Sequence, residues 1–489
     1  MRESDFLKRK PNFQQDFYAQ TLVFLLYFLG AWILLFGTHL AGMWTDLFSP
    51  LDSLFYSYPT KLFSAHLPLW NDRISIGSPA FTDPEFQSFY PPALLIFNLL
   101  PAPLSYHLFL MIHYAAAGFF TYRFMRVQGL GGISCFWGGV VFEFCGFLTA
   151  HKLHINMICA GIYLPVVLLA IERMRQTNRF KYAAYTAIGF ALSILAGYPQ
   201  ITLYMAFVSF AYGLWRSLDL PPAQRNVLIG FVHFAFILGV VLSAIQILPT
   251  IQLFKLATRE SISYRYFSMY SFGLQNLPQL IFPFLYGGGY SNSGFNLALG
   301  AVGMIETAGY AGILPPLLAV LGLIVCWKST PQVRFWSVLA VLSFLLVLGV
   351  STPLYGLLYH VPMVNLFRGP ARNWYECHFA IAVLSSFGLD SLLNKMDTNH
   401  RFAQKATMIF AATCLGAVLI LILAVLTISK LPDSHSIFTW MNVTNVALAR
   451  ANLEMGSPAV LIPLILLTLS AGWLFLLSKK TLKFLPALG

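Results

Sequence analysis

The sequence predicts an all-α polytopic membrane protein with about twelve transmembrane helices. Of its 489 residues, 58% are hydrophobic and only 10% are charged, whereas about a quarter of the residues in an ordinary soluble domain are charged. Apolar runs of roughly twenty residues, the length that crosses a bilayer as a helix, recur along the chain. The segments between these runs are too short to form a soluble domain of any size.

The apolar runs divide the chain in order. Each can satisfy its own backbone hydrogen bonds in lipid as a helix. They cover about residues 20–41, 104–126, 132–150, 155–173, 181–197, 200–217, 226–250, 308–327, 335–350, 375–394, 406–428 and 458–478. No small-residue cleavage site follows the first run, so we expect an uncleaved helix there. We interpret the whole as two membrane modules, residues 1–260 and 261–489.

The distribution of Lys and Arg predicts the orientation. With the N-terminus in the cytoplasm, 20 of the 30 Lys and Arg residues fall on the inner side, as the positive-inside rule requires. The longer loops then lie outside, at residues 42–103, 251–307, 351–374 and 429–457. We therefore expect both termini in the cytoplasm and the functional site on the extracytoplasmic side.

The inner connections exclude several function classes. They are brief and basic, and they carry neither a P-loop nor a dinucleotide-binding glycine pattern. The net charge of +12 is explained by membrane orientation, because no nucleic-acid-binding motif accompanies it. The six cysteines have no CxxC or metal-type spacing, which argues against both a disulfide framework and a metal cluster.

The first long loop concentrates acidic and aromatic side chains. Five of the 18 acidic residues of the chain lie within it. Such a loop suits a polar, ring-shaped substrate at a membrane surface, with aromatic faces packed on sugar C–H groups. The acids are Asp46, Asp52, Asp72, Asp83 and Glu85, and the aromatic candidates for substrate binding are Tyr56, Trp70 and Tyr90.

Asp52 begins a segment, residues 51–67, whose apolar side chains recur at three- and four-residue spacing. That pattern is typical of a short helix lying in the headgroup region. The carboxylate could accept a proton from a substrate hydroxyl. It could equally be the N-cap of this helix. The spacing leaves the two interpretations open.

Arg368 and Arg372 lie just outside the tenth apolar run, in the stretch NLFRGPARNW. Two guanidinium groups beside a Gly-Pro bend could bind a phosphate or pyrophosphate. The alternative is a pair of arginines that extend from a helix end toward the interface. Because this is the less basic side, we favour phosphate binding. Arg259 is a supporting candidate of the same kind.

The external turn AHKLH brings together His151, Lys152 and His154. Histidines at this spacing can ligate a metal, but the sequence indicates no third ligand. We expect these side chains to face the functional cavity as substrate-binding groups, and we assign the same role to Glu306, near the interface. A divalent metal is compatible with the pattern but is not required by it, and no metal ligand is assigned.

Several stretches together resemble a known family. LPLWND and ISIGSPAFTDPEFQSFYPP, within residues 67–92, resemble the first-loop signature of bacterial YfhO-type membrane proteins. Further family-like stretches follow in the expected order at residues 142–173, 194–204, 243–254, 303–318 and 362–393. The last hundred residues resemble nothing that we can place. Tyr198 departs from the family, in which AGHPQ is common where this chain has AGYPQ.

The family belongs to the GT-C class of membrane glycosyltransferases. The resemblance implies a multi-pass protein of the bacterial cytoplasmic (inner) membrane. It also implies transfer of a sugar from a polyprenyl-phosphate donor to a lipid or cell-envelope glycan acceptor outside the cytoplasm, with inversion. It places the general base at Asp52, with Asp46 as the second candidate, and the lipid phosphate at Arg368 and Arg372. The roles of Asp83 and Glu85 remain open. Two alternatives are a flippase for lipid-linked saccharides and a membrane acyltransferase with a histidine base.

Overall fold

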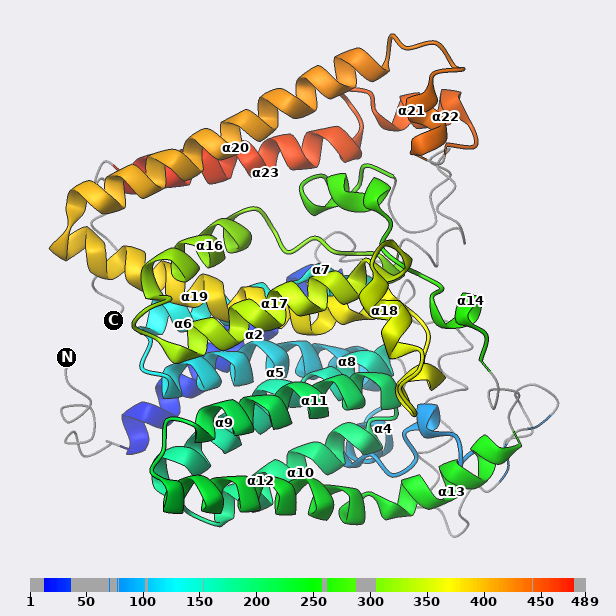
Figure 1. Ribbon diagram of the computed structural model, residues 1–489, viewed down its shortest axis with the longest axis vertical. Helices are drawn as coiled ribbons and strands as arrows, with labels where there is room; N and C mark the ends of the chain where they lie inside the picture. Colours follow the sequence, from blue (N-terminus) through cyan, green and yellow to red (C-terminus); the bar gives the residue numbers. More distant parts are fainter. Residues whose placement is uncertain are drawn as a thin grey trace.

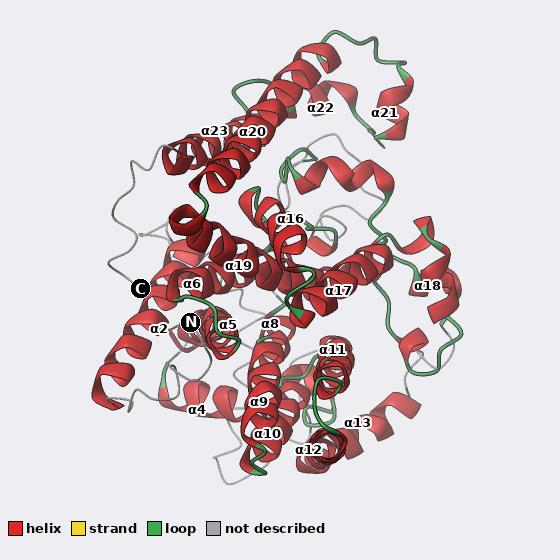
Figure 2. Cartoon of the chain, turned by 60° about the vertical axis from the view of Figure 1, so that its left-hand side comes forward, coloured by secondary structure: helices red, strands yellow, loops and turns green. Residues whose placement is uncertain are grey.

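The computed structural model describes residues 13–36, 70, 77, 79–101, 104–152, 154–256, 262–286, 305–441 and 443–478. Every regular element of these residues is helical, and none of them forms a β-strand (Figure 2). The predicted all-α fold is therefore confirmed.

The elements follow one another through α-helices and short 3-10 helices, the latter written η. In chain order they are α2 (Phe13–Phe36), η2 (Pro84–Phe86), α4 (Pro91–Leu99), α5 (Leu104–Val127), α6 (Gly132–Glu143), α7 (Gly146–Ala150), α8 (Ile155–Gly161), α9 (Tyr163–Thr177), α10 (Lys181–Leu195), α11 (Pro199–Ser217), α12 (Pro222–Leu242), α13 (Ala244–Lys255), α14 (Tyr264–Phe267), η4 (Leu274–Leu280), α16 (Leu314–Cys326), α17 (Pro331–Val347), η5 (Gly349–Ser351), α18 (Pro353–Leu358), η6 (Val364–Leu366), η7 (Pro370–Asn373), α19 (Trp374–Thr398), α20 (His400–Ile428), α21 (Ser436–Trp440), α22 (Val446–Asn452) and α23 (Pro458–Ser478).

Seven helical segments of the described residues are long and apolar enough to cross a membrane. Three shorter apolar helices, α10, α16 and α17, accompany them. The chain is thus a multi-pass membrane protein, as predicted. The number of about twelve spans stays a prediction.

Several predicted spans contain breaks that hydropathy does not show. The runs at 132–150 and 155–173 are each two helices, α6 with α7 and α8 with α9. The run at 308–327 was predicted to start too early, since α16 begins only at Leu314. Gly312 has a positive φ of 87° just before it, a left-handed conformation in which a helix does not begin.

The helices run between two ends of a bundle (Figure 1). The helix α2 begins and α23 ends at the left-hand end of the bundle, whereas α4, α14 and α18 gather at the opposite end. These three short helices fall in the predicted loops 42–103, 251–307 and 351–374. On α4, Leu95 and Leu99 are exposed, as expected of an interfacial helix.

Two hydrophobic clusters form the interior. The first extends from Ala31 on α2 to Phe387 on α19 and includes α5, α9, α10 and α17. The second is formed largely by α20 and α23, which pack along one another, and it also includes Phe282 and Leu318. Helix α19 contributes to both clusters and joins the C-terminal hairpin to the rest.

Two buried glutamates in the apolar segments have contrasting surroundings. The carboxylate of Glu172 accepts hydrogen bonds from Arg216 Nε and Nη2 at 3.0 and 2.9 Å, and from the Tyr212 hydroxyl at 2.9 Å. Glu143, at the end of α6, is fully buried, and neither of its carboxyl oxygens has a hydrogen-bond partner among the described residues. A buried carboxyl without partners destabilises the fold, because it has lost its hydration.

We expect replacement of these glutamates by leucine to have opposite effects. Glu143→Leu should raise the free energy of unfolding by about 1–3 kcal/mol, because it removes an unpaired polar group. Glu172→Leu should lower it by about 3–5 kcal/mol, because the Arg216 guanidinium is left buried without its anion. Thermal unfolding of both variants in detergent measures the two shifts. Shifts of the same sign would show that Glu143 has a stabilising partner.

Candidate functional site

Four side chains from separate parts of the chain meet at the end of the bundle opposite the start of α2. They are His151 after α7, Gln200 at the start of α11, Glu306 before α16, and Arg372 on η7. Arg372 Nε donates to Glu306 Oε2 at 2.9 Å, and Arg372 Nη2 donates to Glu306 Oε1 at 2.5 Å. Arg372 Nη1 donates to Gln200 Oε1 at 2.8 Å. Each of the three guanidinium nitrogens therefore donates to a protein group.

His151 adds a second donor to the Glu306 carboxylate. Its ring is fully buried. Its Nδ1 lies 2.8 Å from the Phe147 carbonyl oxygen and its Nε2 lies 3.4 Å from Glu306 Oε2. Both neighbours are acceptors, so both contacts are hydrogen bonds only when the ring carries both of its protons.

The surroundings of Glu306 keep it ionised. Burial by itself would raise the pKa of this carboxyl. The hydrogen bonds from Arg372 and His151, together with their charge, outweigh burial and hold the pKa well below its ordinary value. Glu306 thus neutralises Arg372 within the site.

Arg368 has a different environment from Arg372, four residues away. Its side chain is half-buried, and no carboxylate among the described residues pairs with it. The guanidinium instead lies over two tyrosine rings, 5.0 Å from the centroid of Tyr266 and 5.5 Å from that of Tyr270. Cation–π contacts hold the group in place without neutralising its charge.

The backbone around Arg368 is held in uncommon conformations. Gly369 has φ 89° and Tyr270 has φ 63°, the latter rare for a residue with a bulky side chain. Only Tyr270 is strained, since glycine adopts positive φ freely. The two segments are tied together by the amide of Ala371, which donates to the Tyr270 carbonyl at 3.2 Å. Gln200 Nε2 also donates to the Arg368 carbonyl at 2.9 Å. Strain of this kind concentrates at functional sites.

The first-loop segment that contains Asp83 and Glu85 packs against the turn that contains Tyr198. A Cβ on Gly197 would lie 2.0 Å from the Pro84 carbonyl oxygen, so the close approach requires glycine. Asp83 Oδ1 accepts from the Glu85 amide at 2.9 Å as the N-cap of η2. Glu85 is exposed, and its backbone carbonyl accepts from Asn156 Nδ2 at 2.6 Å.

Tyr198 lies among the charges of the site. The Arg372 guanidinium is 5.6 Å from the centroid of its ring. Burial raises the pKa of the Tyr198 phenol; Glu306 and Glu85 raise it further, and Arg372 and Arg368 act in the opposite sense. The phenol therefore stays protonated at neutral pH and can donate a hydrogen bond.

His154 and Lys152 lie at the edge of this cluster. Both are partly open to solvent, and the His154 ring centroid is 5.4 Å from that of His151. Desolvation, with a smaller contribution from His151, lowers the pKa of His154 to about 4. The imidazole is therefore neutral at pH 7.

The other predicted site residues are not part of this cluster. Tyr90 is fully buried and hydrogen-bonded to His113 and Tyr163, each at 2.8 Å. Trp70 is exposed, and its ring lies against Gly77. Four further predicted residues lie outside the described ranges: Asp46, Asp52, Tyr56 and Arg259. Within those ranges, no group of three His, Cys, Asp or Glu side chains could hold a metal ion.

An apolar cavity of about 600 Å³ lies beside the first turns of α19, directly after the segment that contains Arg368 and Arg372. Trp374, Cys377 and Ile381 of α19 line one wall. Phe344 of α17 and Cys414 of α20 also line it, and the Phe344 ring centroid is 5.8 Å from that of Trp374. The cavity can hold an apolar chain.

Sequence reasoning did not assign Gln200, Tyr266 or Tyr270 to the site. Gln200 ends the stretch AGYPQ, and the structure buries it. The signal in the sequence is an amide side chain directly after a Gly-Tyr-Pro turn between two apolar runs. The two tyrosines stand one turn apart at 266 and 270 in an aromatic stretch. Nothing in the local pattern relates them to an arginine about a hundred residues later.

Comparisons with known proteins identify only distant structural likenesses. A scan of protein-family models gives no match, and a search of curated proteins gives none either. The chain is similar to the structure of ArnT from Cupriavidus metallidurans bound to undecaprenyl phosphate, with a TM-score of 0.43 and 16% identity over 94% of this chain and 77% of that one. It is also similar to the apo oligosaccharyltransferase of Archaeoglobus fulgidus, with a TM-score of 0.40 and 14% identity. That likeness covers 93% of this chain and 56% of the other.

We expect Glu306 and Arg372 to be energetically coupled. Glu306→Gln and Arg372→Gln should each lower the free energy of unfolding by about 3–5 kcal/mol, because each leaves a buried charge unpaired. The loss in free energy of unfolding of the double variant should be smaller than the sum of the two single losses by about 1–3 kcal/mol. Unfolding of the wild type, the two single variants and the double variant is measured in detergent as a double-mutant cycle. Arg265→Gln, at an exposed position, is the control. Strictly additive losses would contradict the coupling.

The low pKa of Glu306 predicts acid sensitivity. A carboxyl whose pKa is depressed by folding contributes stability that is complete above its unfolded value, about 4.3, and that is lost as the pH falls toward the folded value. The melting temperature of the wild type should therefore exceed that of Glu306→Gln by a constant margin above about pH 5.5 and by a shrinking margin below about pH 4.3. A margin that is unchanged or grows at pH 3 would contradict this origin.

Proposed function

We propose that this chain is a membrane glycosyltransferase of the GT-C kind. It transfers a sugar from a polyprenyl-phosphate donor to a hydroxyl of an extracytoplasmic acceptor, either a lipid or a cell-envelope glycan, and inverts the anomeric carbon. The observation that carries the proposal is the contrast between Arg368, without a carboxylate partner among the described residues, and the neutralised Arg372 beside it.

Arg368 is suited to the phosphate of the donor. Guanidinium groups bind phosphate oxygens through paired N–H donors. The Tyr266 and Tyr270 rings orient this one and add no negative charge. Arg372 supports it indirectly, because its contacts with Glu306 and Gln200 fix the turn that presents Arg368. We therefore assign Arg368 to direct phosphate binding and Arg372 to positioning.

The apolar cavity beside α19 supports a lipid-linked donor. It begins at Trp374, two residues after Arg372, and lies between α17, α19 and the C-terminal hairpin. We propose that a donor whose phosphate contacts Arg368 places its isoprene units along this apolar wall. A soluble nucleotide sugar would leave the wall unused, and burial of apolar surface favours the lipid.

The reaction then needs one base and one anion-binding group. The Asp52 carboxylate accepts the proton of the acceptor hydroxyl, and the hydroxyl oxygen forms a bond to the anomeric carbon from the face opposite the phosphate. The bond from that carbon to the phosphate oxygen breaks, and polyprenyl phosphate leaves with the added negative charge. A guanidinium already in place stabilises that charge most in the transition state.

The remaining polar groups of the site are suited to the sugar and the acceptor. Tyr198 can donate a hydrogen bond from its phenol, and neutral His154 can accept one. Glu85 places an exposed carboxylate on the same side of the cluster. Asp46 is the second candidate for the base, and Trp70 offers an exposed aromatic face.

The decisive measurement is transfer of radiolabelled sugar from polyprenyl-phosphate donors by purified protein in proteoliposomes. We expect Asp52→Asn to lower the rate by about 10²–10⁴-fold, and Arg368→Gln to lower it by about 10²-fold. Asp46→Asn and Glu85→Gln should retain most of the activity. Arg265→Gln, which alters an exposed arginine next to Tyr266, is the matched control for Arg368 and should leave the rate unchanged.

Two outcomes would overturn the proposal. If the wild type transfers no sugar from a broad donor panel but moves lipid-linked sugar across vesicles, the chain is a flippase. If Arg368→Gln and Arg265→Gln lose activity equally, Arg368 does not bind the phosphate. Donor binding by Asp52→Asn, measured separately, distinguishes loss of the base from loss of the fold.

A further inference from the structure

The apolar cavity beside α19 has an unpaired hydrogen-bond donor in its wall. Trp374, which lines the cavity, is only 2% exposed. Its Nε1 is buried and has no hydrogen-bond partner among the described residues. The other lining side chain with an N–H or O–H group is Thr413, which donates to the Ile409 carbonyl oxygen at 2.9 Å. A buried N–H without an acceptor destabilises the protein, because it has lost its hydration.

The indole is held with the edge that contains Nε1 at the cavity wall. The His378 ring stacks on it with centroids 5.2 Å apart, and the Phe272 ring meets it edge to face at 5.2 Å. A Cβ on Gly309, which also lines the cavity, would lie 2.6 Å from Trp374 Cε2, the ring carbon bonded to Nε1. The ring cannot turn toward another acceptor without losing these contacts. The donor is therefore preorganised for a ligand.

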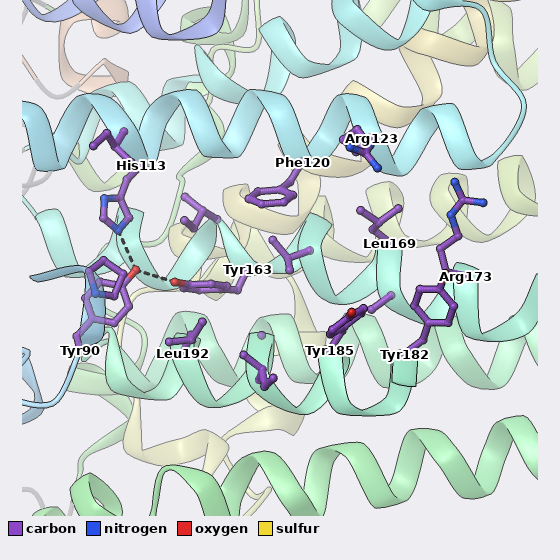
Figure 3. A pocket seen from close by; sticks show the side chains of 17 residues that line it. Tyr90, His113, Phe120, Arg123, Tyr163, Leu169, Arg173, Tyr182, Tyr185 and Leu192 are labelled. Carbon is purple, nitrogen blue, oxygen red and sulfur yellow. Dashed lines mark hydrogen bonds between the residues drawn. The ribbon is translucent and has the colours of Figure 1, made fainter. Parts of the chain in front are cut away.

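A second large cavity has a different arrangement of polar groups. It has a volume of about 840 Å³ and lies between α5, α9 and α10. At one end, the Tyr90 hydroxyl lies 2.8 Å from both His113 Nε2 and the Tyr163 hydroxyl (Figure 3). His113 Nδ1 lies 2.6 Å from the Phe109 carbonyl oxygen. These three side chains satisfy one another and need no ligand, whereas the Trp374 indole does not have an acceptor of this kind.

The unpaired indole N–H lies near the proposed phosphate site. The Arg368 guanidinium lies over the Tyr270 ring, and the Trp374 indole lies against the Phe272 ring. Tyr270 and Phe272 are two residues apart in one segment, a separation of at most about 7 Å along the backbone. Groups that contact Arg368 and Trp374 can therefore belong to the head of one lipid.

We propose that the cavity binds a lipid whose phosphate is attached directly to a single isoprenoid chain, and that Trp374 Nε1 donates to the ester oxygen between the two. This inference rests on the proposed function, because it takes the phosphate to be at Arg368. Val341 lines the cavity and is 62% exposed on α17, so the chain can enter from the surrounding lipid. The indole then fixes how far the chain enters.

The single unpaired donor also distinguishes this lipid from a glycerophospholipid. A prenyl phosphate brings one oxygen to the start of its apolar chain, and Trp374 can pair with it. A glycerophospholipid carries acyl ester oxygens between its phosphate and its chains. Those oxygens would be buried without donors among the lining side chains, which disfavours binding.

The first test is lipid binding by the purified full chain in detergent, with geranylgeranyl phosphate as the probe. Trp374→Phe keeps an aromatic ring and removes the N–H. We expect it to weaken binding about tenfold, the contribution of one hydrogen bond to a charged group. Trp327→Phe, at a 42% exposed position outside the cavity, should leave the affinity unchanged. Equal losses in the two variants would overturn the proposal, as would equally tight binding of dioleoyl phosphatidic acid by the wild type.

The indole gives a second readout that a purely structural role would not change. With ¹⁵N-labelled tryptophan in the wild type, the indole N–H signal that is missing in Trp374→Phe should move downfield at saturating geranylgeranyl phosphate. A signal that stays in place while the lipid binds would overturn the hydrogen bond. If Trp374→Phe melts below the wild type, benzothienylalanine at this position, with sulfur in place of the N–H and nearly the same shape, should show the same loss of affinity.

The chain-binding part of the proposal has a matched pair of variants on α17. Val341→Trp should weaken binding by narrowing the cavity, whereas Val338→Trp, one turn away at 61% exposure and outside the lining, should not. Equal effects would overturn this part. None of these measurements depends on sugar transfer. Binding through Trp374 without transfer from any donor would refute the proposed function and still support the binding mode, and transfer without a shift of the indole signal would refute the binding mode alone.

Discussion

The ion pair between Arg372 and Glu306 organises the candidate site. It joins the segment before α16 to the segment before α19, and His151 and Gln200 extend it to α7 and α11. A buried pair of this kind is costly to form, and breaking it leaves a charge without hydration. It therefore restricts how these four segments can meet, and with them the positions of Arg368 and Tyr198.

The same pair explains why two arginines in one short motif have different chemistry. Glu306 and Gln200 accept hydrogen bonds from all three nitrogens of Arg372, and the Glu306 carboxylate offsets its charge, which weakens its attraction for a further anion. Arg368 lies on the faces of Tyr266 and Tyr270, whose attraction depends on the ring quadrupole and leaves the charge uncompensated. We therefore propose separate roles for the two residues, one in structure and the other in binding.

Hydropathy predicted the all-helical membrane fold and most helix positions, because lipid imposes the helix on any apolar run of sufficient length. It missed the breaks at Ile162 and Ser243, since these residues are as apolar or as small as their neighbours. The local sequence selected Arg372, His151 and Glu306 individually. It could not show that Arg372 is neutralised by Glu306, because that depends on a contact across 66 residues.

The aromatic contacts of Arg368 also bear on the kind of ligand that the candidate site suits. The guanidinium is held over two tyrosine rings, and the cluster beside it contains its own carboxylates. Aromatic faces hold a cation without replacing an anionic ligand, and neighbouring carboxylates limit how tightly an anion is retained. The arrangement therefore suits a ligand that binds, reacts and leaves.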